Sequence, residues 1–405
     1  MIPEIHIEDY NYGLDDARIA KYPLPERDAS KLLHYRDGIV DEYVFRDLPS
    51  LLPSDCLMVF NDTKVVPARL HFQRESGAHI EIFCLEPVSP VEYNTAFAAT
   101  HTCSWKCVIG NAKKWKQDIL HLYNPDGSPE IASLGLRARL LGRDERTGCV
   151  EFSWEDGSPF SRVLEVAGTV PIPPYLNRET EGIDKDRYQT LYAHIRGSVA
   201  APTAGLHFTQ NTLDGLRQKG IEMHTVCLHV GAGTFLPVKS SLVSEHPMHR
   251  EPFVVGKELL IRLRAAALEG RSVVAVGTTS VRTLESLYYI GVSCLEAGAP
   301  ADVEQWAPYT REYPYSTEDA LGAILDYLDA KGLDSLVAGT RIIIVPGFQF
   351  RLVDKMLTNF HQPESTLILL VSAFVNGDWR TIYDYALAHG FRFLSYGDSS
   401  LLERR

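Results

Sequence analysis

The chain has 405 residues, which is longer than one hydrophobic core usually grows, so its length predicts two domains. Its 45% hydrophobic and 23% charged residues are typical of an ordinary folded protein and exclude a disordered or fibrous one. The net charge of −12 argues against a protein that holds nucleic acid over its whole surface.

The N-terminal residues predict strands rather than a targeting signal. Residues 1–9 carry acidic side chains and no basic region followed by an apolar run, so they do not form a secretory signal. Residues 32–48 predict a β-hairpin with its turn at 37–38, because an apolar segment precedes the turn and alternating apolar residues follow it. Residues 57–60 predict a short buried strand that leads into polar residues at 61–63.

Residues 65–154 have the pattern of a small all-β domain. Short segments of alternating polarity are separated by turn signals rich in glycine, aspartate and proline. Strands at this spacing are typical of a small sandwich or barrel. The alternating segments lie at 68–72, 79–85, 138–141 and 149–154.

The β region also contains the densest basic run of the chain. Such a run predicts either a contact with nucleic acid or a solvated strand edge kept soluble by lysine. Cys103 and Cys107 are a close pair, but without a second pair they do not predict a zinc site. The remaining cysteines are scattered, which favours reduced thiols over disulfides. The basic run consists of Lys106, Lys113, Lys114 and Lys116, with Trp105 and Trp115 beside them.

After the proline-rich segment 171–174 the pattern changes to alternating strands and helices, which predicts an α/β domain with a largely parallel sheet. The β region therefore interrupts a discontinuous domain. We expect residues 1–64 and 160–405 to form the α/β domain and residues 65–159 to form an inserted small β-barrel. The predicted strands are 222–230, 272–276 and 341–345, and the predicted helices are 213–219, 259–268, one from about 281, 365–375 and 379–389. The longest apolar stretch, 367–375, is too short to span a bilayer.

Two loops that follow predicted strands are candidate ligand sites. In the first, Gly277, three hydroxyl residues and Arg282 lie where a strand gives way to a helix. Free N–H groups at a helix start suit a phosphate or a carboxylate, and simple N-capping by a hydroxyl is the alternative. In the second, Gly347 allows close approach of a ligand to the backbone and Phe348 offers a stacking ring, with core packing as the alternative.

A third loop surrounds His207 with small residues, and histidines are dense from there to His249. Neutral imidazoles suit zinc, but Pro247 breaks the helix that would align two of them, and no HExxH pattern is present. We therefore expect no metal. Dinucleotide-binding, P-loop and nucleophile-elbow motifs are also absent from the sequence.

Several ordered strings are together similar to the signatures of one enzyme family, the S-adenosylmethionine:tRNA ribosyltransferase-isomerases of the queuosine pathway. The resemblance covers most of the chain. Departures occur at Lys31, at Gln362 and at Ser399 with Ser400. The matching strings are 55–70, 197–209, 228–235, 277–286, 346–348, 358–367 and 393–398.

The resemblance implies an α/β domain with an inserted β-barrel and implies the reaction. The ribosyl group of S-adenosylmethionine is transferred and isomerised onto 7-aminomethyl-7-deazaguanine at the tRNA wobble position, adenine and methionine leave, and epoxyqueuosine results. No cofactor beyond S-adenosylmethionine as co-substrate is implied. We expect a cytoplasmic monomer that binds tRNA and no membrane, with Lys113 and Lys114 serving tRNA affinity more than turnover.

The implied chemistry selects the candidate site residues. The sulfonium makes the 5′ carbon acidic, so a base of near-neutral pKa is needed, and His207, His229, His249 and His361 are the candidates. Asp62, Glu251 and Asp398 are candidates to accept the proton of the acceptor amine. Arg282 with Thr278, Thr279 and Ser280 suits the methionine carboxylate. The other substrate-binding candidates are Arg69, Thr203, Gly205, Gly233, Thr234, Gly347, Phe348, Asn359 and Tyr396.

Two other interpretations make distinct predictions. A histidine-rich metallohydrolase would contain stoichiometric metal and lose activity with a chelator. A non-catalytic RNA-binding module would bind tRNA without releasing adenine from S-adenosylmethionine.

Overall fold

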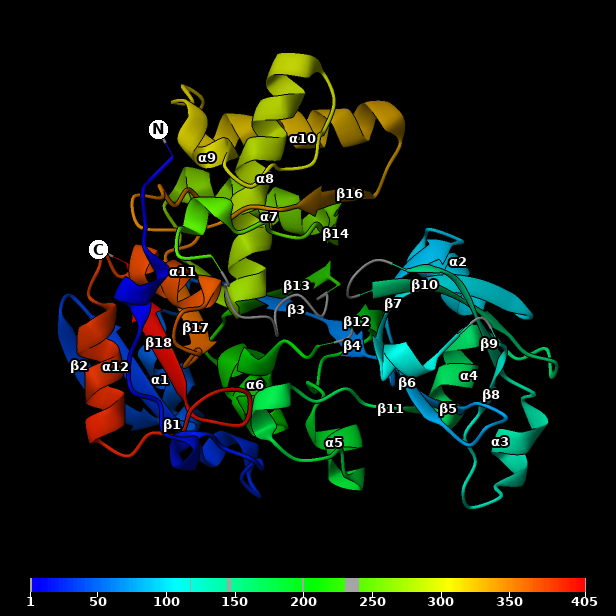
Figure 1. The fold of residues 1–405 in the computed structure, drawn as a ribbon. Helices are drawn as coiled ribbons and strands as arrows, with labels where there is room; N and C mark the ends of the chain where they lie inside the picture. Colours follow the sequence, from blue (N-terminus) through cyan, green and yellow to red (C-terminus); the bar gives the residue numbers. More distant parts are fainter. Residues whose placement is uncertain (1, 117, 144–146, 199, 230–239, 405) are drawn as a thin grey trace.

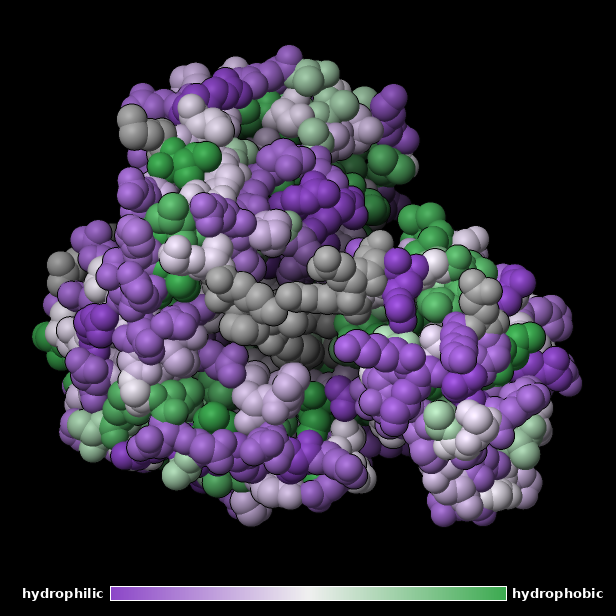
Figure 2. All heavy atoms as spheres, viewed as in Figure 1, coloured by the Kyte–Doolittle hydropathy of each residue, from purple (hydrophilic) through white to green (hydrophobic). Residues whose placement is uncertain are grey.

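The computed structural model describes residues 2–116, 118–143, 147–198, 200–229 and 240–404. It consists of an α/β body built on a nine-stranded sheet and a smaller β-barrel that projects from one side of that body (Figure 1). Hydrophilic side chains cover most of the face seen in Figure 2, and hydrophobic ones are scattered over it in small groups. Within the described ranges, no helix is long and apolar enough to cross a membrane.

The large sheet is mixed. Parallel pairing joins β13, β3, β15 and β17 at its centre and joins β18 to β1, whereas the other neighbours are antiparallel. The predicted α/β class is confirmed, but antiparallel strands at both flanks make the sheet less parallel than we expected. The strands in sheet order are β16 (Ser335–Thr340), β14 (Glu251–Gly256), β13 (Glu222–Leu228), β3 (Leu57–Asn61), β15 (Val273–Val276), β17 (Lys355–Asn359), β18 (Ser399–Glu403), β1 (Lys31–Arg36) and β2 (Ile39–Val44).

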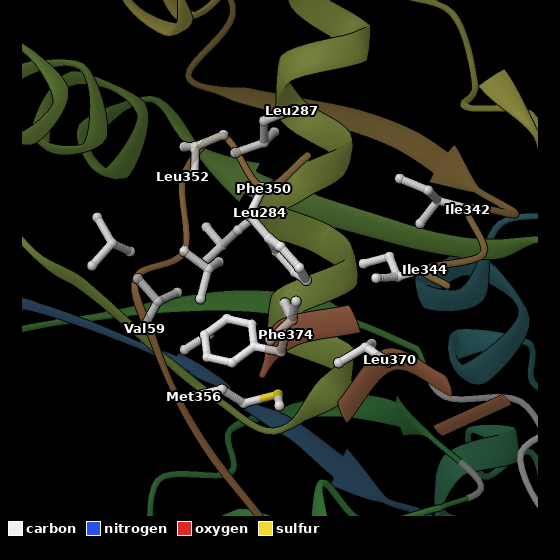
Figure 3. Packing of buried hydrophobic residues seen from close by; sticks show 14 of the residues in the cluster. Val59, Leu284, Leu287, Ile342, Ile344, Phe350, Leu352, Met356, Leu370 and Phe374 are labelled. Atoms are coloured by element: carbon white, nitrogen blue, oxygen red, sulfur yellow. The ribbon is translucent and has the colours of Figure 1, made fainter. Parts of the chain in front are cut away.

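Helices cover both faces of this sheet. Because successive strand residues point to opposite faces, Leu57 and Val59 pack into the larger core while Met58 and Phe60 pack into a second core behind it. Figure 3 shows part of the larger core, in which Leu284 and Leu287 of a long central helix meet side chains from the loop that follows β16. The larger core is formed with α7 (Lys257–Glu269), α8 (Thr278–Ala297), α10 (Thr317–Lys331), α11 (Thr366–Phe374) and α12 (Trp379–Ala388), and the second with α1 (Leu48–Leu51) and α6 (Gln210–Gln218).

The inserted domain is a closed antiparallel barrel. Its six strands form a ring because the last strand in the order, β8, pairs back to the first, β5, through Phe72 and Leu122. The core of the barrel holds Trp105, Phe152 and, from the helix that follows, Phe160. The ring consists of β5 (Arg69–Gln73), β6 (His79–Ser89), β7 (Thr102–Gly110), β10 (Thr147–Ser153), β9 (Arg137–Arg143) and β8 (Leu120–Leu122). The predicted insertion of a β-barrel into an α/β domain is thus confirmed.

Short elements join the two parts. β4 (Thr63–Val65) pairs in parallel with β12 (Ile195–Ser198), so the chain leaves and re-enters the α/β body at neighbouring points. α4 (Phe160–Ala167) and β11 (Gly168–Thr169) pack on the barrel, which therefore extends in contacts to Thr169. The remaining helices are α2 (Tyr93–Ala98), α3 (Pro129–Ser133), α5 (Gly182–Arg187) and α9 (Ala307–Thr310).

The predicted strand at 341–345 is wrong. The residues that form the strand are 335–340, and the apolar run after them is buried without ladder pairing. Its N–H groups bond outside the main sheet instead: Arg341 and Ile343 donate to the carbonyl oxygens of Val303 and Gln305 at 2.9 and 3.2 Å. Ile342 N–H donates to Thr340 Oγ1 at 3.0 Å, and Val345 N–H donates to Tyr309 Oη at 2.9 Å. Apolar runs of this length predict burial but not pairing.

The close approach of α8 and α10 gives a stability test. A Cβ on Gly291 of α8 would lie 2.2 Å from the carbonyl oxygen of Ala320 in α10, so the helices would have to separate. We expect Gly291→Ala to lower the free energy of unfolding by about 1–3 kcal/mol, measured by urea titration. Gly182→Ala is the control, because a Cβ there meets nothing within 4 Å. Equal effects of both substitutions would contradict this packing.

Candidate active site

A pocket of about 110 Å³ opens where β15 and β17 end. These neighbouring strands are parallel, and ligands of α/β sheets commonly bind at the carboxyl ends of such strands. The start of α8 and the start of α11 form two of its walls. The lining residues are Tyr175, Tyr188, 200–204, 277–279, Arg282, 358–362, Ser365, Leu367, Leu394 and Ser395.

The start of α8 presents free N–H groups to this pocket. Gly277 has φ of 88°, a left-handed conformation that favours glycine, and it ends β15 with its own N–H bonded to Leu357 O at 2.8 Å. No side chain caps the helix, because its N-cap residue is Gly277, and Ser280 Oγ donates to Val276 O at 2.7 Å. The first turn of a helix has no intrahelical acceptor for its N–H groups, so Thr278 and Thr279 offer donors to an anion.

Arg282 borders the same pocket and is 5% exposed. Its Nε donates to Ile342 O at 3.1 Å and its Nη1 donates to Glu251, which is fully buried. Its Nη2 is buried and has no hydrogen-bond partner among the residues that the structure describes. One donor of a buried cation thus remains unused at the pocket.

Glu251 holds Arg282 from behind. Burial favours the neutral carboxyl, but Arg282 and the bonded His249 outweigh it and keep the pKa of Glu251 below its usual value. His249 Nε2 lies 3.2 Å from Glu251 Oε1, and the His249 side chain is 37% exposed. Glu251 does not line the pocket, so its contact with Arg282 orients the guanidinium.

His361 is the one of the four candidate histidines that lines the pocket. Its ring Nε2 lies 2.9 Å from Thr358 Oγ1. Its backbone N–H donates to Tyr383 Oη at 3.0 Å, and its backbone carbonyl accepts from the Tyr12 hydroxyl. Burial lowers the pKa of His361 to about 4. The ring is therefore neutral at pH 7 and able to accept a proton.

His207 lies behind the pocket with both ring nitrogens engaged. Asn359 Nδ2 donates to Nε2 at 3.1 Å, so the proton resides on Nδ1, which lies 2.8 Å from Ser30 Oγ. The ring stacks on Phe45 with centroids 5.0 Å apart. Burial lowers the pKa of His207 to about 3. His207 thus positions Asn359, which itself lines the pocket with a buried and unbonded Oδ1.

Asp62 and His229 lie between the α/β body and the barrel rather than in the pocket. Asp62 follows β3, and burial raises its pKa. His229 follows β13 and stacks on Tyr93 of α2, with centroids 4.5 Å apart and the rings 13° from parallel. Burial lowers the pKa of His229 to about 4.

Three further candidates hold structural contacts. Asp398 accepts from the N–H groups of Lys31 at 3.0 Å and Arg392 at 2.8 Å and from the Arg392 side chain. Tyr396 Oη donates to Asp184 at 2.8 Å, and that bond contributes to a raised pKa of Tyr396 after burial. Gly205 is packed so closely that a Cβ would lie 1.9 Å from Tyr192 Oη.

Other candidates lie apart from the pocket. Arg69 belongs to the barrel, with its guanidinium 5.6 Å from the ring centre of Phe83. Gly347 has φ of 95° and Phe348 is buried against Phe350 in the larger core. Gly233 and Thr234 lie outside the described residues. The candidates that line the pocket are Thr203, Thr278, Thr279, Arg282, Asn359 and His361.

Sequence reasoning missed several lining residues. Tyr188 is fully buried, and its hydroxyl has no hydrogen-bond partner in the described part of the chain. Tyr175 Oη and Ser395 Oγ are 2.5 Å apart. Ser365 precedes α11, and the start of a predicted helix was the available signal for it. Among the described residues, no group of three or more metal-ligating side chains is arranged to hold an ion.

The buried neutral histidine predicts a pH effect on stability. The imidazole of His207 takes up a proton near pH 6.5 in the unfolded chain. In the folded chain burial lowers its pKa, so it takes up the proton only near pH 3. The stability due to neutral His207 is therefore present above pH 6.5 and is lost as the pH falls. We expect the free energy of unfolding to fall by up to about 1.4 kcal/mol per pH unit from this group, and His207→Gln to remove that slope. Ser30→Ala keeps the imidazole and should keep the slope.

Comparison with known proteins gives concordant matches. A family model described as "Queuosine biosynthesis protein" matches residues 7–402. S-adenosylmethionine:tRNA ribosyltransferase-isomerase of Xylella fastidiosa strain M12 is 39% identical over 97% of this chain and 96% of its own. The protein of that name from Trichlorobacter lovleyi is 36% identical over 98% and 99%. A crystal structure of S-adenosylmethionine tRNA ribosyltransferase from Thermotoga maritima is 27% identical, covers 97% of this chain and 99% of that chain, and superposes with a TM-score of 0.47.

Proposed function

The chain belongs to the S-adenosylmethionine:tRNA ribosyltransferase-isomerases of queuosine biosynthesis, and we propose that the pocket at the ends of β15 and β17 binds its S-adenosylmethionine. The enzyme transfers and isomerises the ribosyl group of that substrate onto tRNA. The observation that carries the pocket assignment is the unused Nη2 of buried Arg282, because a buried guanidinium donor needs an anionic or polar acceptor.

The methionine carboxylate is the acceptor that S-adenosylmethionine offers. Arg282 provides a charged donor, and the free N–H groups of Thr278 and Thr279 add the positive end of the α8 dipole. Glu251 and His249 fix the guanidinium from the opposite side. Glu251 therefore acts as a positioning residue and is not free to accept a proton from the acceptor amine.

We assign the adenine to the same pocket. Asn359 and Tyr188 line it, and their Oδ1 and Oη atoms, buried without partners among the described residues, are an acceptor and a donor for the edge of the base. Phe360 and Tyr175 add aromatic walls. The chain from Ser30 through His207 holds the amide of Asn359 in place.

His361 is the base that we assign. The positive sulfur acidifies the adjacent 5′ carbon, and the neutral imidazole accepts one proton from that carbon to leave an ylide. After that step the bond from the ribosyl group to adenine breaks, the acceptor amine forms a new bond to a ribosyl carbon while losing its own proton, and the carbon–sulfur bond breaks to release methionine. Burial lowers the pKa of His361 to about 4, so the ring is neutral at pH 7, and the assignment rests on its place in the pocket wall rather than on its basicity.

The acceptor is proposed to be 7-aminomethyl-7-deazaguanine at the tRNA wobble position, with epoxyqueuosine, adenine and methionine as products. Its amine must lose a proton, and Asp62 remains a candidate for that step. Asp62 follows β3, the strand beside β15, and one of its carboxylate oxygens is buried without a partner in the described ranges. The raised pKa of Asp62 suits a proton acceptor.

The barrel is the part that we assign to tRNA contact. Lys113 and Lys114 are exposed. Arg143 lies beside them, because its Nη1 donates to the carbonyl oxygen of the adjacent Ala112 at 2.9 Å. Trp105 and Trp115 are buried in the barrel core, so stacking by these rings on RNA bases is not part of the proposal. The proposal is that the basic side chains contact the phosphate groups of the tRNA backbone.

Release of adenine tests the function. We expect adenine to form from S-adenosylmethionine with tRNA that carries 7-aminomethyl-7-deazaguanine and not with tRNA that carries guanine at that position. In single-turnover reactions His361→Gln should lower the rate by about 10²–10⁴, the usual contribution of a general base. Release with neither tRNA would sink the proposed function, and an unchanged rate in His361→Gln would remove His361 as the base.

Salt dependence of tRNA binding tests the barrel. Replacing both Lys113 and Lys114 with Gln should weaken binding and reduce the slope of log affinity against log salt by about 1–2, as two phosphate contacts are lost. The rate at saturating tRNA should change little. Lys331→Gln, at the exposed end of α10, is the control and should leave the slope unchanged. An unaltered slope in the double variant would contradict barrel docking through these lysines.

A further inference from the structure

A second, smaller pocket of about 40 Å³ lies beyond Arg282. It shares Arg282, Ser365 and Leu367 with the larger pocket, so the two are neighbours separated by the guanidinium and the start of α11. None of the chemistry assigned above uses this second pocket.

Apolar side chains form about half of its walls, and His246, His249 and Thr366 are among the polar lining residues. Ile342 and Ile344 come from the segment after β16, and Leu370 comes from α11. In Figure 3 the side chains of Ile344 and Leu370 lie near each other on one side of α8. Met248 adds a partly exposed and adaptable side chain at the rim. The volume and the walls suit a short aliphatic chain and not a purine.

Its polar end suits a carboxylate. Arg282 Nη2 is buried and lacks a partner among the described residues, and Arg282 belongs to both pockets. α11 is nine residues long and begins beside it, and Ser365 does not cap that helix because its Oγ donates to Gln362 O at 2.8 Å. The uncapped first turn adds N–H donors next to the unused guanidinium donor.

We propose that the second pocket holds the amino-acid arm of S-adenosylmethionine, with the methylene groups against Ile344, Leu367, Leu370 and Met248. The carboxylate lies at Arg282 where the starts of α8 and α11 converge. The inference rests on the proposed function and adds to it: the larger pocket recognises the nucleoside, and the smaller one distinguishes the intact sulfonium substrate from nucleosides without the arm.

A substitution that fills the second pocket tests this division. Met248→Trp should raise KM for S-adenosylmethionine in the adenine-release assay by about tenfold or more, in the range that misfit of an apolar pocket produces. Inhibition by 5′-methylthioadenosine, which keeps the nucleoside and lacks the amino-acid arm, should stay within about twofold of the wild-type value because its binding needs the larger pocket alone. Leu268→Trp, on the exposed face of α7, is the control for adding an indole elsewhere.

The outcomes separate the two proposals. An unchanged KM in Met248→Trp, or equal loss of S-adenosylmethionine and 5′-methylthioadenosine binding, would overturn the amino-acid subsite and leave the proposed function standing. Failure of the wild-type enzyme to release adenine with modified tRNA would overturn the proposed function and this inference with it. A second probe is S-adenosylmethionine without its carboxylate, which should bind the wild type at least about tenfold more weakly.

Discussion

The buried ion pair between Glu251 and Arg282 fixes the centre of the molecule. A buried charge is costly unless it is paired and hydrogen-bonded, so β14, which begins at Glu251, and α8, which carries Arg282, must meet at this point. Ile342 O adds a third contact from the chain after β16. Three segments of the chain are thereby aligned, and the guanidinium donor left without a partner in the described ranges belongs to a residue that lines both pockets. In the proposed assignment, stability and substrate recognition depend on the same side chain.

The proposed assignments place the chemistry and the RNA contact in separate parts of the fold. The proposed reaction site lies at the ends of the parallel strands, whereas the barrel is a closed unit with its own core, connected through β4 and β12. His229 on Tyr93 is one of the contacts across that connection. Such an arrangement allows the barrel surface to vary in charge without disturbing the buried groups that line the pocket.

The sequence was sufficient for the class of fold and for the family, and insufficient for the site. Alternating polarity located β5, β6 and β10, and helical periodicity located α6, α7 and α12, because each pattern is local. The strand prediction failed at 341–345, where a buried apolar run outside any strand ladder has the same pattern as a strand. The sequence could not assign roles to the histidines, because their partners are distant in sequence. His207 bonds to Ser30 and Asn359, which are 177 and 152 residues away, and these bonds are what show that its ring positions Asn359.

The pairing of β1 with β18 places the first strand beside the last, with Leu32 opposite Ser399. During synthesis on the ribosome, β1 and β2 are made early, and more than three hundred further residues are added before β18, the other neighbour of β1, is made. Contacts of such large sequence separation slow folding, since a long loop must close before they form. The barrel, whose strands are contiguous in sequence, is complete long before that moment. The nascent chain can therefore complete its barrel first, and the pocket, which needs residues as late as Ser395, only near the end of synthesis.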